Sequence, residues 1–275
     1  MIKILIQSAV FLLISLTFAK WRKKLSEIRK HNTYETDSSI ALYCEFHYGD
    51  EYFNVANFPK KYAEYALQKM QYKNKINALE IGCAVGRASF ELAHEFTQVT
   101  GMDFSARFIQ VANQLKENAT LRYAIPDEGD IVRYKETSLK ALGFYSIKQR
   151  CHFIQQDACD LKPIFQGYDL ILGANLIDRL YQPRKFLDNI HHRINDSGLL
   201  ILTSPYTWLE EFTEKRYWLG GYKQNGENVT TLDGLKNILL EHFELIDVAD
   251  IPFVIRETKR KFQHSIAEVS TWQKR

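Results

Sequence analysis

The sequence predicts a doubly wound α/β domain, in which helices cover both faces of a parallel, Rossmann-like sheet. From about residue 75 onward, short apolar runs alternate with segments of helical periodicity. The first of these runs ends in a glycine turn, and the next two are followed by aspartates. Because these strands are apolar on both sides, they are typical of a parallel sheet buried between two helical layers.

The predicted strands are short apolar runs bounded by glycine or polar residues. They span residues 76–81, 98–102, 151–155, 168–173 and 199–202. The first connecting helix is predicted over residues 87–96. Ser105 is the expected N-cap of the second helix, and Pro183 is at the favoured first position of the third. The apolar face of the third helix comprises Phe186, Leu187, Ile190 and Ile194.

The end of the chain continues the pattern with one helix and two strands. Leu232, Leu235 and Leu239 have helical spacing, and residues 243–248 and 266–272 resemble strands. Two stretches depart from the repeat. Residues 119–150 are too long for a simple connection and predict an insertion. Residues 205–230 follow a central strand, where open α/β sheets bind ligands, so they predict either a substrate lid or a packed surface excursion.

The first 30 residues differ from the predicted domain, which covers residues 31–275. Residues 4–19 carry no charge, and six Lys or Arg residues follow them by residue 30. This basic flank favours a short membrane tether that keeps the body of the chain in the cytoplasm. A cleaved signal peptide and a misassigned start codon are the alternatives.

Composition excludes several classes of function. The net charge of +3 is too small to make nucleic acid the expected partner. The four cysteines form no CxxC pair, which favours a reducing compartment and argues against a structural zinc site. No metal site is predicted, and a small molecule is the expected substrate.

Two glycines stand four residues apart where the first strand turns into a helix. Gly82 allows a sharp backbone turn, and Gly86 allows close approach of helix and ligand. A dinucleotide fingerprint would need glycine at the positions of Ala84 and Arg87. The turn is therefore poorly suited to a pyrophosphate and suits an uncharged nucleoside with an amino-acid tail.

Two aspartates extend this pattern. Asp103 follows the second strand, where a carboxylate can accept hydrogen bonds from both ribose hydroxyls, and Asp157 follows the third, where it can accept from an adenine amino group. The combination resembles the class I S-adenosylmethionine-dependent methyltransferases, which implies S-adenosylmethionine as the cofactor. The cofactor-binding residues predicted here are Glu80, Gly82, Gly86, Asp103, Phe104, Asp157, Ala158 and Asn175.

A narrower resemblance rests on longer segments. These are FHYG (46–49), GCAVGR (82–87), DFSARFI (103–109), ANLIDRL (174–180), TSPYTWLEE (203–211), WLGG (218–221), PFVIRET (252–258) and RKFQH (260–264). Together they resemble the 4-mercaptohistidine N1-methyltransferase module of ovothiol biosynthesis, over about residues 34–275. In the fused enzyme this module follows an iron-dependent sulfoxide synthase region, which this sequence lacks. The resemblance implies a stand-alone final step, served by separate sulfoxide synthase and sulfur-releasing enzymes.

Three residues are predicted to act in catalysis. Asp178 and Tyr206 follow the fourth and fifth strands, at the edge where the acceptor is expected. His264 is predicted as a proton acceptor, because histidine is the side chain most often used for that role near neutral pH. The alternative for His264 is a structural residue.

Four residues are predicted to bind the substrate. Arg179 follows the fourth strand, and Arg256 has the planar fork that holds a carboxylate bidentately. Glu211 or Glu257 is the expected partner of the substrate ammonium group. The alternative for Arg256 and Glu257 is an ion pair with each other across a strand.

Two other functions remain open from the sequence. A membrane-tethered methyltransferase of a quinone or lipid would account for residues 4–19 and the basic flank. A non-catalytic donor-binding protein is the alternative from another class, although the glycine turn and both aspartates argue against it.

Overall fold

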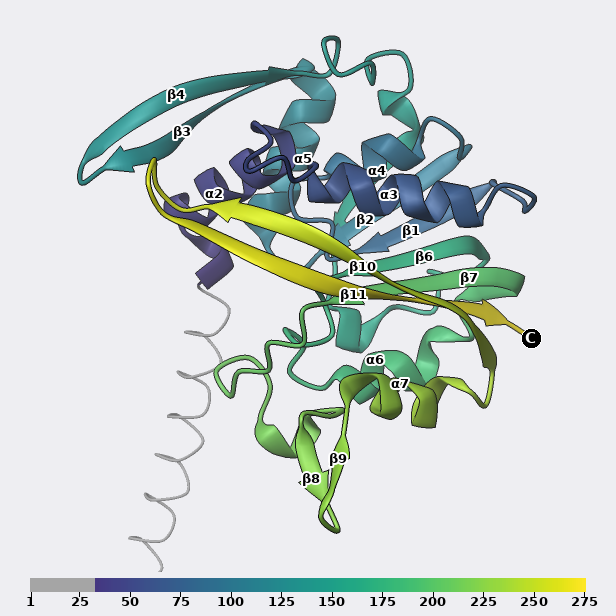
Figure 1. Ribbon diagram of the computed structural model, residues 1–275. Helices are drawn as coiled ribbons and strands as arrows, with labels where there is room; N and C mark the ends of the chain where they lie inside the picture. Colours follow the sequence, from purple (N-terminus) through teal and green to yellow (C-terminus); the bar gives the residue numbers. More distant parts are fainter. Residues whose placement is uncertain (1–32) are drawn as a thin grey trace, which may run out of the picture.

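A seven-stranded sheet forms the centre of the protein, whose computed structural model describes residues 33–275 (Figure 1). Its strands are β1 (Asn77–Ile81), β2 (Gln98–Asp103), β5 (Cys151–Gln155), β6 (Tyr168–Ala174), β7 (Ile194–Ser204), β10 (Phe243–Arg256) and β11 (Phe262–Lys274). The strand order is β10-β11-β7-β6-β1-β2-β5. In the sheet, β1 lies between β2 and β6. The chain after β1 therefore first forms strands on one side of β1, and later forms strands on its other side. Ligands bind outside the carboxyl ends of the strands at such a point.

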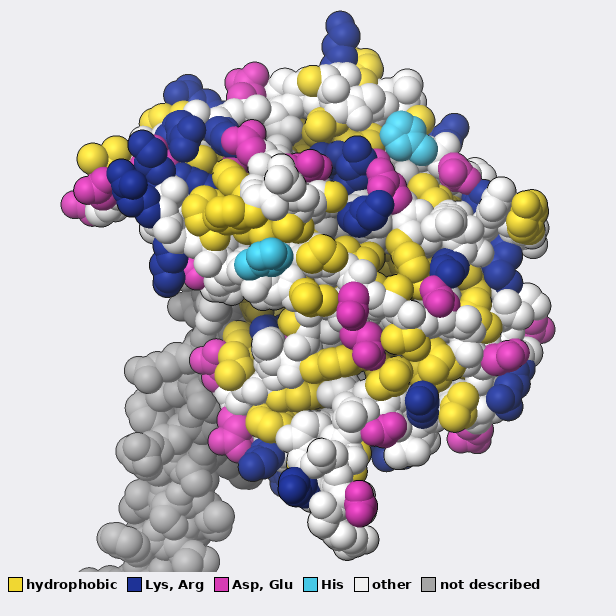
Figure 2. All heavy atoms as spheres, in the orientation of Figure 1, with side chains coloured by type: hydrophobic (Ala, Val, Ile, Leu, Met, Phe, Trp, Pro, Cys, Tyr) yellow, Lys and Arg dark blue, Asp and Glu magenta, His cyan; other side chains and the backbone are white. Residues whose placement is uncertain are grey.

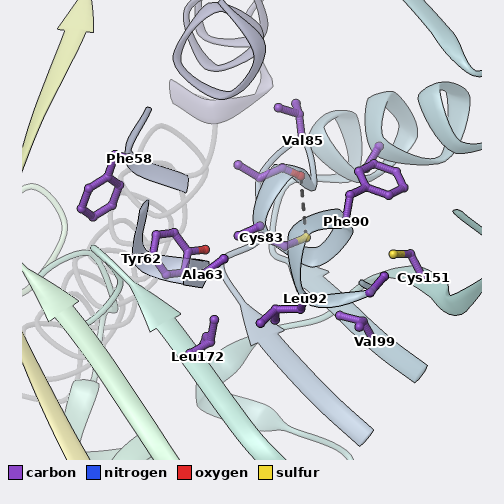
Figure 3. Close-up of a cluster of buried hydrophobic side chains, with 14 of the residues drawn as sticks. Phe58, Tyr62, Ala63, Cys83, Val85, Phe90, Leu92, Val99, Cys151 and Leu172 are labelled. Atoms are coloured by element: carbon purple, nitrogen blue, oxygen red, sulfur yellow. Dashed lines mark hydrogen bonds between the residues drawn. The ribbon is translucent and has the colours of Figure 1, made fainter. Parts of the chain in front are cut away.

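Helices cover both faces of the sheet (Figure 1). On one face lie α2 (Asp37–Tyr48), α3 (Phe58–Lys69), α4 (Arg87–Leu92) and α5 (Ala106–Asn118), and on the other lie α6 (Pro183–Ile190) and α7 (Thr231–Leu239). Each face has its own buried hydrophobic cluster. Figure 3 shows part of the first, in which Tyr62 of α3 and Phe90 of α4 join Val99 and Leu172 of the sheet. The predicted doubly wound fold is confirmed.

The helices begin where the sequence provides caps. The Ser105 hydroxyl accepts a hydrogen bond from the backbone N–H of Phe108 at 3.1 Å, as expected for an N-cap. α6 begins with Pro183. α7 begins with a capping box, in which Thr230 and Asp233 satisfy each other's backbone N–H groups. Local side-chain chemistry therefore fixes the ends of these elements.

The structure corrects three details of the predicted fold. The sheet is not wholly parallel, because β11 runs antiparallel to both β7 and β10. Ile194 does not lie on the face of α6, which ends at Ile190; it begins β7, where it pairs with Tyr168. The two C-terminal strands are also longer than predicted and form one continuous hairpin.

The two irregular stretches form small structures of their own. Residues 119–150 contain the hairpin of β3 (Thr120–Glu128) and β4 (Ile131–Ser138), followed by the short helix η2 (Lys148–Arg150). Residues 205–230 contain the short helix η4 (Lys215–Tyr217) and the hairpin of β8 (Tyr222–Gln224) and β9 (Glu227–Val229). Before α2, the short helix η1 (Thr33–Glu35) packs beside α5.

The predicted leader and tether, residues 1–30 with the uncharged run at 4–19, lie outside the described residues. Between residues 33 and 275, no helix is long and apolar enough to cross a membrane. On the face shown in Figure 2, basic and acidic side chains are interspersed. Charges of both signs therefore offset one another across this face.

Candidate active site

One large cavity lies at the carboxyl ends of the parallel strands. Its volume is about 660 Å³. Four strand ends contribute to its wall: Gly82 follows β1, Asp103 ends β2, Asp157 follows β5 and Asn175 follows β6. The sheet therefore brings residues from four separate segments to one site.

The glycine turn forms the floor of this cavity beside β1. Gly82 and Ala84 line it with φ angles of +77° and +45°. Gly86 has φ +88°, and a Cβ atom there would lie 2.7 Å from the ring of Phe153. Gly86 lies outside the cavity wall, and its role is to let α4 begin close against the sheet. The backbone path therefore leaves open space above the turn, as a bound nucleoside needs.

Asp103 is fixed beside the turn by backbone hydrogen bonds. Its Oδ2 atom accepts from the N–H of Ala84 at 2.9 Å, and its Oδ1 atom accepts from the N–H of Ser105 at 2.8 Å. Burial raises the pKa of the Asp103 carboxyl to about 6, although these N–H groups oppose the rise. Each oxygen keeps a lone pair for a further donor, as two ribose hydroxyls would require.

Asp157 lies at the far side of the same wall. Its Oδ1 atom accepts from the N–H of Cys159 at 2.8 Å and caps the short helix η3 (Ala158–Asp160). Its Oδ2 atom accepts from the Tyr181 hydroxyl at 3.0 Å. Ala158 and Phe104 line the cavity nearby. Six of the eight predicted cofactor-binding residues thus share one cavity wall: Gly82, Asp103, Phe104, Asp157, Ala158 and Asn175.

Glu80 lies beneath the turn and does not line the cavity. Its carboxylate accepts hydrogen bonds from the hydroxyls of Tyr62 and Ser89. It thereby ties α3 and α4 to β1. Burial raises the pKa of the Glu80 carboxyl to about 7.

This raised pKa predicts a pH-dependent stability. Between its ordinary pKa and about 7, Glu80 binds more protons in the folded chain than in the unfolded chain, so the free energy of unfolding falls as pH rises. Between about pH 5 and 8, we expect the free energy of unfolding to fall less in Glu80→Gln than in wild type, by on the order of 1–3 kcal/mol. Urea unfolding at both pH values measures this difference. Glu64→Gln, at an exposed glutamate, is the control. An unchanged pH slope in Glu80→Gln would contradict this prediction.

Aromatic residues that the sequence analysis gave no role line the rest of the cavity. Tyr34 comes from η1, and Tyr43, Phe46 and His47 come from α2. The β10–β11 hairpin contributes Phe253, Ile255, Gln263 and Ser265. The sequence signals for these residues are the density of aromatic residues between positions 34 and 62 and the segments 46–49, 252–258 and 260–264 of the narrower resemblance.

Arg179 lines the cavity and is anchored by its neighbours. Its guanidinium donates to the Asp178 carboxylate at 2.8 Å and to the backbone oxygen of Thr207 at 2.9 Å. It lies 4.9 Å from the centre of the Phe212 ring. Asp178 itself is fully buried outside the cavity wall, and burial raises its pKa. Asp178 therefore orients Arg179.

The other two predicted catalytic residues also lie outside the cavity wall. The Tyr206 hydroxyl donates to Glu268 at 2.6 Å, and burial with this partner raises the pKa of Tyr206. His264 is exposed on β11 between Gln263 and Ser265, which both line the cavity. Since side chains alternate along a strand, His264 projects from the opposite face.

Three predicted substrate-binding residues lie elsewhere as well. Glu211 is exposed outside the cavity wall. Arg256 is buried and pairs with Asp127 at 2.5 Å, rather than with Glu257 across a strand. Glu257 pairs with Lys261 at 2.5 Å. Arg179 is thus the predicted substrate-binding residue that the fold brings to the cavity.

Comparison with known families identifies this arrangement. A family model described as a methyltransferase domain matches residues 72–244, which is more than half of the chain. The chain belongs to this methyltransferase family. Membership confirms the predicted class of enzyme, with S-adenosylmethionine as the cofactor. No curated protein sequence matches the methyltransferase significantly.

Solved structures show the same fold. The N-methyltransferase NodS from Bradyrhizobium japonicum WM9, in complex with S-adenosyl-L-homocysteine, has 16% identity and a TM-score of 0.51, covering 87% of this chain and 99% of that chain. Magnesium protoporphyrin IX methyltransferase from Synechocystis PCC 6803, with bound S-adenosylmethionine, has 14% identity and a TM-score of 0.53, covering 91% and 97%. At these identities the likeness establishes the fold of the methyltransferase.

Proposed function

We propose that this enzyme transfers a methyl group from S-adenosylmethionine to a ring nitrogen of a thiol-histidine, the last step of ovothiol-type biosynthesis. The observation that carries the proposal is the composition of this large cavity. Residues suited to the donor come from β1, β2 and β5, and aromatic residues come from α2 and the β10–β11 hairpin at the opposite edge of the sheet. The volume of about 660 Å³ is in the usual range for small-molecule sites.

The segments behind the narrower resemblance also support a thiol-histidine acceptor. Residues 46–49, 174–180 and 252–264 lie far apart in the sequence, and each contributes to the cavity wall. Arg179 suits the carboxylate of an amino acid. Arg216, the other arginine in the lining, pairs with Glu214 at 2.8 Å. Rings such as Tyr43 and Phe253 suit the faces of a planar imidazole.

In the proposed reaction, the protein chiefly orients its two substrates. S-adenosylmethionine supplies a methyl group on a positively charged sulfur, which a nitrogen lone pair takes directly. Asp103 and Asp157 hold the nucleoside, and Arg179 holds the acceptor carboxylate. The aromatic walls exclude water and restrict the acceptor ring. Such alignment contributes about 7–11 kcal/mol in favourable cases, and the ring proton passes to solvent.

The test is methyl transfer by the full chain to three acceptors at equal concentration: 5-thiohistidine, histidine and a quinone precursor. We expect a methylated product from 5-thiohistidine and turnover on histidine that is lower by roughly 100-fold or more, because polar groups facing the sulfur lose their partner. Equal turnover on histidine would overturn the sulfur-specific proposal. A preference for the quinone precursor would support the membrane-associated alternative instead.

A further inference from the structure

His47 is a buried polar residue in the cavity wall that the proposed mechanism does not use. It lies on α2 and is 5% exposed. Its ring centre is 6.1 Å from that of Tyr43 and 5.7 Å from that of Phe46. His47 lines the cavity, so the small part of this residue that is accessible faces the cavity.

One nitrogen of this ring already has a partner. The Nδ1 atom accepts a hydrogen bond from the backbone N–H of Arg87 at 3.4 Å. Arg87 is the first residue of α4. The N-cap of this helix is Gly86, which has no side chain that could accept a hydrogen bond from the first backbone N–H groups of the helix. When Nδ1 accepts, the hydrogen of a neutral imidazole is on Nε2. Among residues 33–275, no hydrogen-bond partner of Nε2 is found.

The surroundings keep this imidazole neutral. Burial, together with the positive charge of Arg87, lowers the pKa of His47 to about 3. Arg87 lies on α4, and its guanidinium pairs with Glu91 at 2.6 Å. Tyr43 and Tyr48, whose rings lie 6.1 and 6.2 Å from that of His47, are on α2 and have raised pKa values. His47 is therefore a hydrogen-bond donor near neutral pH rather than a base.

We propose that His47 donates a hydrogen bond from Nε2 to the acceptor sulfur and thereby selects nitrogen as the methylated atom. This inference rests on the proposed function. A thiol-histidine offers two rival nucleophiles, and a thiolate sulfur is a strong one. A hydrogen bond to the sulfur occupies a lone pair, lowers its reactivity and turns the ring nitrogen toward the donor. The N–C bond forms as the donor's S–C bond breaks, and the ring proton leaves to solvent.

The experiment compares two substitutions of the same residue. His47→Leu removes the donor, whereas the amide of His47→Gln can accept from Arg87 and still donate into the cavity. The products formed from 5-thiohistidine are separated into N-methyl and S-methyl isomers by chromatography and identified by proton NMR. We expect the S-methyl share to rise by roughly 10-fold or more in His47→Leu and to stay near wild type in His47→Gln. Exposed His94→Leu is the matched control.

Each outcome decides between explanations. An unchanged isomer ratio in His47→Leu would overturn the proposal, and so would an equal loss of selectivity in both variants, which would indicate a purely steric role. If wild type binds S-adenosyl-L-homocysteine yet does not methylate 5-thiohistidine, the proposed acceptor fails. Nitrogen-15 NMR of the histidine-labelled protein then tests the protonation of His47 separately, and the signal that is missing in His47→Gln assigns its ring. A ring that gains a second proton between about pH 8.5 and 5.5 would overturn its role as a neutral donor.

Discussion

Asp103→Ala is expected to weaken the binding of S-adenosyl-L-homocysteine by roughly 100-fold or more. In the proposed donor site the variant removes an ionised acceptor for two ribose hydroxyls, and hydrogen bonds to charged groups contribute about 1.5–3 kcal/mol each. It also frees the N–H of Ala84, which Asp103 holds at 2.9 Å. Titration calorimetry measures the dissociation constant.

Asp103→Asn separates the two effects. The amide keeps one oxygen for the backbone and loses the negative charge, so we expect an intermediate affinity. Thermal unfolding of each variant confirms that the domain is intact. A dissociation constant for Asp103→Ala within about threefold of wild type would remove Asp103 from the donor site.

Arg179→Lys is expected to raise the KM for 5-thiohistidine by roughly 10- to 100-fold. Lysine keeps the positive charge beside Asp178, which is fully buried, but it loses the planar fork that binds a carboxylate bidentately. The affinity for S-adenosyl-L-homocysteine should stay within about twofold, because the proposed donor contacts are those of Asp103 and Asp157. Steady-state kinetics and calorimetry measure the two quantities.

Arg256→Lys is the matched control for this prediction. Arg256 is also an arginine paired with an aspartate, Asp127, but it lies outside the cavity wall. We therefore expect it to lower thermal stability and leave the acceptor KM near wild type. If Arg256→Lys raises the acceptor KM and Arg179→Lys does not, the assignment of the carboxylate site is reversed.

Much of the fold could be predicted because its parallel strands are buried on both sides. An apolar run such as residues 168–173 has few other stable environments, and a following glycine or aspartate defines its end. The sequence predicts Ile194 on a helix because its spacing from Ile190 fits one, whereas only contact with Tyr168 shows that β7 has begun. The β10–β11 hairpin was underestimated because β10 contains Pro252, which an edge strand tolerates.

The two halves of the site differ in how much the sequence reveals. The donor half depends on local geometry, so the glycine turn and Asp103 form a recognisable pattern within about 20 residues. The proposed acceptor half is assembled from η1, α2 and the β10–β11 hairpin, which no local pattern connects. Tyr206 and His264 were plausible as isolated chemical groups, but hydrogen bonding to Glu268 and strand alternation place them outside the cavity wall.

The position of β11 affects how the domain is assembled. β11 follows β10 in the chain but lies between β7 and β10 in the sheet. During synthesis β10 emerges first, yet its only strand partner in residues 33–275 is β11. β10 can therefore join the sheet only together with β11 or after it. The part of the cavity wall that Phe253 of β10 provides consequently cannot be completed until residues 262–274 have been synthesised.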